Sequence, residues 1–184
     1  MTTKNRVCPW WVIWTFDNPL RKLIHNPREI LSGLVDAGQT ALDIGCGMGF
    51  FTIEMACEVG PNGQVIAADL QEKMLAGVRQ RANQANVQDR IQYHLCQPGR
   101  IGLAEKVDFA LAFWMVHEVP EPVSLFREVF DLLKPNGKLL IVEPMIHVTQ
   151  AAFQRTTEIA QSVGLRIQET RNVRISRAIL LSKS

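Results

Sequence analysis

From residue 40 onward, short apolar runs alternate with longer segments in which apolar residues recur every three or four positions. Short runs bounded by turn residues are typical of buried strands, and the longer periodic segments are typical of helices that bury one face. The runs that predict strands are Thr40–Ile44, Gln64–Ala68, Ile91–Leu95, Val107–Phe113 and Lys138–Glu143. This alternation predicts a doubly wound, Rossmann-like α/β fold, in which a mostly parallel sheet carries helices on both faces.

The segments between and after these runs supply the expected helices and two further strands. The helices are a segment through Glu58, Glu72–Asn86, a helix from Pro122 to the turn Pro135-Asn136-Gly137, and Thr149–Val163. Two closing runs, about Leu165–Val173 and Ala178–Ser182, are expected to pair as a hairpin. Upstream, Asn18-Pro19 and Asn26-Pro27 each place proline at a first helical position, and the second begins a helix over Pro27–Val35.

The stretch Thr40–Phe51 carries the first chemical signal, because a predicted strand runs into glycine at every second position. Gly45, Gly47 and Gly49 let the chain bend sharply and let a ligand approach the main chain with no Cβ in the way. Twenty residues beyond Gly49, the next predicted strand is followed by Asp69, where a carboxylate can accept hydrogen bonds from ribose hydroxyls. The pattern predicts a site for a small molecule that contains a nucleoside.

The spacing of the glycines indicates which kind of nucleoside-containing ligand the site can bind. The dinucleotide fingerprint needs a third glycine where this chain has Phe50, and its pyrophosphate would be repelled by Asp43 just before the turn. A ligand with an ammonium or sulfonium group is compatible with that aspartate.

The segments DIGCGMG and AADL, at this separation, resemble the cofactor site of class I S-adenosylmethionine-dependent methyltransferases, and the resemblance runs from about Pro27 to the end. DLLKPNGKLLIVEP is a second match, to the helix-turn-strand of quinone-biosynthesis and related small-molecule methyltransferases. The resemblance implies a seven-stranded sheet with an antiparallel C-terminal strand. It also implies a transferase that uses S-adenosylmethionine, leaves S-adenosylhomocysteine and methylates an unidentified small molecule.

The same resemblance implies roles for particular residues on the cofactor side. The three glycines would hold the methionine half, Asp43 would support its ammonium group, and Asp69 would accept from the ribose hydroxyls. The family usually has an aspartate after the third strand, next to the adenine amino group, and this chain has Cys96-Gln97 there. The amide oxygen of Gln97, or backbone groups, would then contact the adenine. The full expected cofactor site is Asp43, Gly45, Gly47, Gly49, Asp69, Leu70, Cys96, Gln97 and Phe113.

The acceptor would lie beyond the fourth strand, where Trp114 and His117 follow Phe113. His117 is a candidate general base, because its ordinary pKa lies near neutrality, or a histidine packed at a helix start. Glu143, which ends the fifth predicted strand, is a second pocket candidate. Its alternative role is a hydrogen bond that stabilises the fold. Many methyl transfers need little acid–base help, so proximity and alignment can supply most of the acceleration.

The N-terminal segment, residues 1–26, contains Trp10, Trp11 and Trp14. These side chains would form an aromatic lid over the substrate pocket, or cover the sheet or a dimer partner, or dip into a membrane surface. The sequence leaves the three alternatives open, and with them the existence of a homodimer.

Composition narrows the class of protein. With 184 residues, 47% apolar and 21% charged, the chain is expected to be one domain, residues 1–184, and a net charge of +2 argues against DNA as a partner. Neither a secretory signal nor an apolar run long enough for stable membrane insertion is found, so a cytoplasmic location is expected.

The four cysteines give no sign of a metal site. Cys8, Cys46, Cys57 and Cys96 lack metal-ligand spacing, so no metal is expected; Cys46 and Cys57 are expected to be small buried side chains. Only Cys8 and Cys96 are expected to reach the pocket, which disfavours arsenite as acceptor. The rival functions are a non-catalytic scaffold or sensor that binds S-adenosylmethionine, and a nicotinamide-dependent dehydrogenase.

Overall fold

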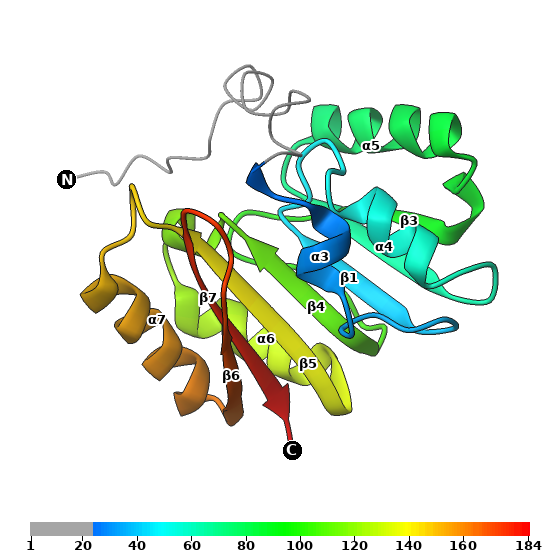
Figure 1. Ribbon diagram of the computed structural model, residues 1–184. Coiled ribbons are helices and arrows are strands. Elements are labelled where there is room, and N and C mark those ends of the chain that lie inside the picture. Colours follow the sequence, from blue (N-terminus) through cyan, green and yellow to red (C-terminus); the bar gives the residue numbers. More distant parts are fainter. Residues whose placement is uncertain (1–23) are drawn as a thin grey trace.

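The computed structural model describes residues 24–184, and at its centre is a seven-stranded sheet in the order β3-β2-β1-β4-β5-β7-β6 (Figure 1). The strands are β1 Thr40–Ile44, β2 Gln64–Asp69, β3 Ile91–Leu95, β4 Val107–Phe113, β5 Leu133–Pro144, β6 Leu165–Arg171 and β7 Ser176–Lys183. Strands β3, β2, β1, β4 and β5 pair in parallel, and β7 runs antiparallel to both β5 and β6. The predicted fold, with its antiparallel C-terminal strand and closing hairpin, is confirmed.

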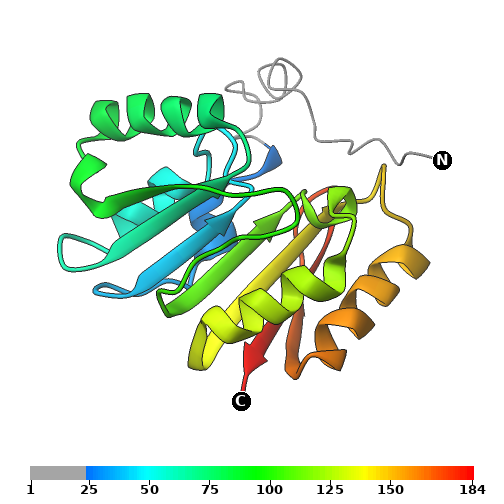
Figure 2. The same ribbon diagram turned by 180° about the vertical axis from the view of Figure 1, so that it is seen from behind.

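Helices cover both faces of this sheet. They are α3 Pro27–Leu31, α4 Thr52–Glu58, α5 Glu72–Ala85, α6 Pro122–Leu132 and α7 Gln150–Ser162, with the 3₁₀ turns η1 Gln88–Arg90 and η2 Val116–Glu118. Side chains of α3, α4 and α5 form one core with the sheet, and those of α6 and α7 form a second on the opposite face (Figure 2). Successive strand residues alternate between the two cores, as Leu111 and Ala112 of β4 do.

Several element boundaries differ from the sequence-based expectation. Helix α3 ends at Leu31 and not at Val35, and Gly33 follows in a left-handed turn with φ +71°. Strand β5 begins directly after α6, so Pro135-Asn136-Gly137 lies within the strand and does not precede it. The irregularity is accommodated by a shift in the pairing of β5 with β4 between Val107 and Phe109.

The two cysteines near the glycine turn have different environments. Cys46 is buried, as expected, but Cys57 is exposed, and the expectation for that residue was wrong. Cys57 lies on α4, whose buried face is formed by Thr52, Met55 and Ala56 instead. Cys8 and the helix expected at Asn18-Pro19 lie outside the described residues.

A glycine pair tests how closely the glycine turn packs on α5. Gly49 and Gly60 both have left-handed φ, +86° and +66°, so alanine costs roughly 1–2 kcal/mol of backbone strain at either position. At Gly49 a Cβ would also lie 3.2 Å from the Val78 methyl carbons of α5, whereas at Gly60 it meets nothing within 4 Å. We therefore expect Gly49→Ala to lower the free energy of unfolding in urea more than Gly60→Ala. Equal losses would contradict the packing.

Candidate functional site

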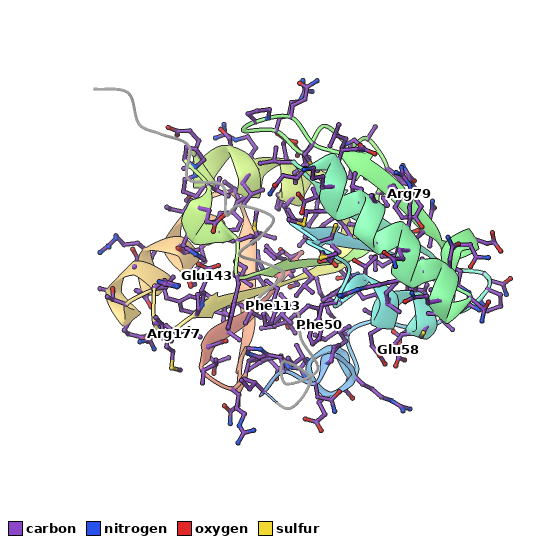
Figure 3. All side chains as sticks on the ribbon, turned by 90° about the horizontal axis from the view of Figure 1, so that it is seen from above. Phe50, Glu58, Arg79, Phe113, Glu143 and Arg177 are labelled. Atoms are coloured by element: carbon purple, nitrogen blue, oxygen red, sulfur yellow. The ribbon has the colours of Figure 1, made fainter. Side chains whose placement is uncertain are left out.

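The carboxyl ends of the parallel strands border a cavity of about 1150 Å³. Its lining comes from the segments that follow β1, β2, β3, β4 and β5, with Ile24 and His25 before α3 and Ile175 in the β6–β7 turn. Ligands of open α/β sheets bind at this edge, beside the point where the strand order reverses. Figure 3 looks onto this end, with Phe50 and Phe113 near the centre and Glu143 to one side.

The glycine turn is tied to the end of β2 by hydrogen bonds. Gly45 N–H and Cys46 N–H both donate to the Ala68 carbonyl, at 2.8 and 3.1 Å. The Asp69 carboxylate accepts from Gly47 N–H at 3.0 Å through Oδ2 and from Gln71 N–H at 2.9 Å through Oδ1. Burial raises the pKa of Asp69, and the backbone N–H donors oppose that shift. An ionised carboxylate has about four acceptor sites, so Asp69 can accept from a ligand in addition to its backbone donors.

The turn leaves little room for a side chain at Gly45. A Cβ on Gly45, whose φ is +67°, would lie 3.2 Å from the Met115 side chain. Gly45 and Gly47 line the cavity, whereas Gly49 is not among the lining residues and packs against Val78 of α5.

Asp43, the next-to-last residue of β1, also lines the cavity. Its side chain is 2% exposed and accepts a hydrogen bond from Thr52 Oγ1 at 2.6 Å. Thr52 is not among the residues expected from the sequence, because its partner is nine residues away across the glycine turn.

The segment after β3 forms the opposite rim. Cys96 N–H donates to the Asp69 carbonyl at 2.8 Å, and Gln97 and Arg100 exchange backbone hydrogen bonds at 3.1 and 3.0 Å. These backbone N–H groups therefore already have acceptors within the protein. The polar group left at the expected adenine position is the Gln97 side chain. Leu70 is 41% exposed at the same rim.

Two thiols border the cavity, and one of them differs from the cysteines that were expected to reach it. Cys46 lines it together with Cys96, although Cys46 was not expected to reach it. Burial is the main cause that raises the pKa of Cys96 to about 12, and burial also raises the pKa of Cys46. Both thiols are accordingly protonated at neutral pH. Within residues 24–184, no group of three His, Cys, Asp or Glu side chains is arranged to hold a metal.

An aromatic wall continues from the glycine turn to the end of β4. Phe51 and Phe113 have ring centroids 4.3 Å apart, and Phe113 stacks on Trp114 at 5.5 Å. His25 meets the Trp114 ring edge-on at 4.9 Å. His25 was missed by the sequence analysis because nothing near it in the chain indicates that it reaches β4.

The β6–β7 turn supports this wall from the far end of the chain. Trp114 Nε1 donates to Ser176 Oγ at 3.0 Å, and that hydroxyl donates to the Arg174 carbonyl at 3.1 Å. Trp114 and Ile175 have φ of 57° and 51°, which is strained for a β-branched residue such as Ile175. Ser176 and Ile175 were also missed, since they lie at the start of β7 and in the turn before it, more than sixty residues beyond Trp114.

His117 lines the cavity beyond β4 and contacts Glu143, which was expected in the pocket but is not among the lining residues. His117 Nδ1 lies 2.8 Å from Glu143 Oε2, and the Glu143 side chain is 1% exposed. The hydrogen bond that His117 makes to the Glu143 carboxylate is the main cause that raises the pKa of His117, and burial opposes it. His147, which the sequence analysis missed, stacks on His117 with ring centroids 6.1 Å apart. Trp10, Trp11 and Trp14 lie outside the described residues.

Comparison with known proteins agrees with this geometry. Residues 35–174 match the family model described as methyltransferase domain. The chain is 34% identical over 110 residues to a demethylmenaquinone methyltransferase from Lactobacillus johnsonii, a match that covers 59% of this chain and 45% of that protein. It is 31% identical over 117 residues to an arsenite methyltransferase from Halobacterium salinarum, covering 63% and 29%. The matched part is thus less than half of either relative.

A solved structure shows the same fold over nearly the whole chain. The S-adenosylmethionine-dependent methyltransferase from Aquifex aeolicus superposes with a TM-score of 0.87 at 23% identity, covering 97% of this chain and all of that one. The chain belongs to the methyltransferase domain family, and it shares the fold of this S-adenosylmethionine-dependent enzyme. None of the helices in residues 24–184 is long and apolar enough to cross a bilayer.

Removing the Ser176 hydroxyl tests the support of the aromatic wall. Ser176→Ala takes away the acceptor of Trp114 Nε1–H in a buried setting, so we expect the free energy of unfolding to fall by about 1–3 kcal/mol. Ser162→Ala is the matched control, because its hydroxyl makes an exposed bond to the Ile159 carbonyl and its loss should change stability little. Equal stability of the two variants in urea would contradict the role given to Ser176.

Proposed function

We propose that this chain transfers the methyl group of S-adenosylmethionine to an apolar small molecule. The observation that carries the proposal is the hydrogen bond between Gly47 N–H and Asp69 Oδ2, which joins the glycine turn and the acidic residue at one edge of the cavity. A turn open to main-chain approach and a carboxylate with free lone pairs are what the amino-acid and ribose parts of this cofactor require.

The lining residues fit the cofactor part by part. Gly45 and Gly47 would face the methionine half, with Asp43 near its ammonium group. Asp69 would accept from the ribose hydroxyls, while Leu70, Cys96 and Gln97 would border the adenine. Phe113 would close the site from β4. All of these residues line the cavity.

The rest of the lining favours an apolar acceptor. Ile24, Val119, Leu125, Ile146 and Ile175 line the cavity beyond the cofactor positions, together with Trp114. Arsenite is a less suitable acceptor, because trivalent arsenic binds thiolates. The two thiols at this cavity have raised pKa values and are therefore protonated at neutral pH.

The cofactor supplies an activated methyl group on a sulfonium, and the chain supplies the geometry. The aromatic wall and the glycine turn would hold the acceptor in line with the methyl carbon and keep water out. Alignment of this kind is worth several kcal/mol of the barrier, without any covalent step on the protein.

Binding and transfer can be tested in order. Calorimetric titration is expected to show micromolar affinity for S-adenosylmethionine and no binding of NAD. Labelled methyl is then expected to appear in reduced demethylmenaquinone in preference to arsenite. Preference for NAD would contradict the proposal, and cofactor binding without transfer to either acceptor would favour a scaffold or sensor.

Asp69→Ala tests the ribose contact. Loss of hydrogen bonds to a charged acceptor costs about 1.5–3 kcal/mol, so the Kd for S-adenosylhomocysteine should rise roughly 10-fold or more. Asp108→Ala is the matched control. Asp108 accepts from Thr40 N–H and from Lys134 Nζ, at 2.9 and 2.7 Å, and is not among the lining residues. The control should leave the Kd unchanged; a Kd unaltered in Asp69→Ala would reject the assignment.

A further inference from the structure

His117 is held against a buried carboxylate by more than one bond. Glu143 Oε1 accepts from Val116 N–H at 3.1 Å, and Oε2 accepts from His117 N–H at 3.1 Å. The same Oε2 lies 2.8 Å from His117 Nδ1. Glu143 at the end of β5 thus fixes both the backbone and the ring of a residue that follows β4.

This arrangement determines which ring nitrogen carries the proton. A carboxylate that already receives two backbone N–H groups acts as an acceptor, so Nδ1 must be the donor. In the neutral ring Nε2 then presents a lone pair. His117 lines the cavity with a side chain 24% exposed, and no described residue forms a hydrogen bond with Nε2. A base oriented by a buried acid, with its other nitrogen open to a pocket, is the usual form of a general base.

The carboxylates near the His117 ring favour its protonated form. Glu143 from β5 and Glu118 from η2 raise the pKa of His117, and burial lowers it. His147, after β5, stacks on the ring with an interplanar angle of 20°. The net effect raises the proton affinity of Nε2 above that of a free histidine, so the neutral base is the dominant form only at pH values above this raised pKa.

We propose that His117 Nε2, with Glu143 as its positioning residue, accepts a proton from the methyl acceptor. The inference rests on the proposed methyl transfer and narrows its substrates to molecules that carry a weakly acidic proton on the nucleophilic atom or on a hydroxyl conjugated with it. That proton passes to Nε2, and the nucleophilic atom, which is the deprotonated atom itself or a ring carbon conjugated with it, forms the bond to the methyl carbon as the carbon–sulfur bond breaks toward sulfur. Where a ring carbon is methylated, the proton on that carbon is then lost to water. The imidazolium then returns its proton to water. Acceptors that attack with a lone pair and no proton, such as trivalent arsenic, need no such base.

The tautomer gives a test that needs neither cofactor nor acceptor. In ¹⁵N-labelled protein, nuclear magnetic resonance is expected to show His117 as the Nδ1–H tautomer, titrating with a pKa above the ordinary 6.5. Glu143→Gln should lower that pKa, and His117→Gln assigns the signal. His94→Gln is the control, since His94 Nε2 bonds the Ile101 carbonyl and lies outside the cavity lining. An Nε2–H tautomer in the unmodified protein overturns the proposal, even if Glu143→Gln fails to fold.

Transfer to reduced demethylmenaquinone gives the second test. With saturating S-adenosylmethionine, kcat is expected to rise with pH through the titration of His117, and His117→Gln should lower it about 100-fold or more. Calorimetry of the same variant should show an unchanged Kd for S-adenosylmethionine, and His94→Gln should match the unmodified protein. Transfer at the full rate by His117→Gln would overturn this inference and leave the proposed function standing. Absence of cofactor binding in the unmodified protein would overturn both.

Discussion

The site depends on the parallel pairing of β1 with β2 on one side and with β4 on the other. The helices after β1 and β2 pack on one face of the sheet, and the helix after β4 packs on the opposite face. The connections therefore diverge at the carboxyl end of β1 and leave a crevice there. The glycine turn, Asp69 and the aromatic wall all border this crevice. Any change that shifted the register of β1 would separate them.

The two halves of the cavity differ in the interactions that build them. The half beside β1 and β2 is assembled from backbone groups, with N–H donors of the glycine turn meeting the Ala68 carbonyl and the Asp69 carboxylate. The half beside β4 and β5 is assembled from side chains, among them the aromatic wall and the pair His117–Glu143. Backbone groups suit a ligand that many related enzymes share, while side chains can vary with the acceptor.

The sequence predicted the first half far better than the second. Gly45, Gly47 and Asp69 are close in the chain to the strands that place them, so their spacing carries the geometry. His25 and Ser176 lie at opposite ends of the described chain and meet at Trp114 and the Arg174 carbonyl through tertiary packing alone. Residue spacing contains no signal for such contacts. The same limit explains Cys57, whose place on a helix was foreseen but whose outward direction was not.

The most direct measurement is a crystal structure of the protein with S-adenosylhomocysteine. We expect ribose hydroxyls within hydrogen-bond distance of the Asp69 carboxylate, the amino-acid part over Gly45 and Gly47, and the sulfur directed toward the side of the cavity where His117 lies. A ligand bound away from Asp69, or with its sulfur directed away from that side, would contradict it.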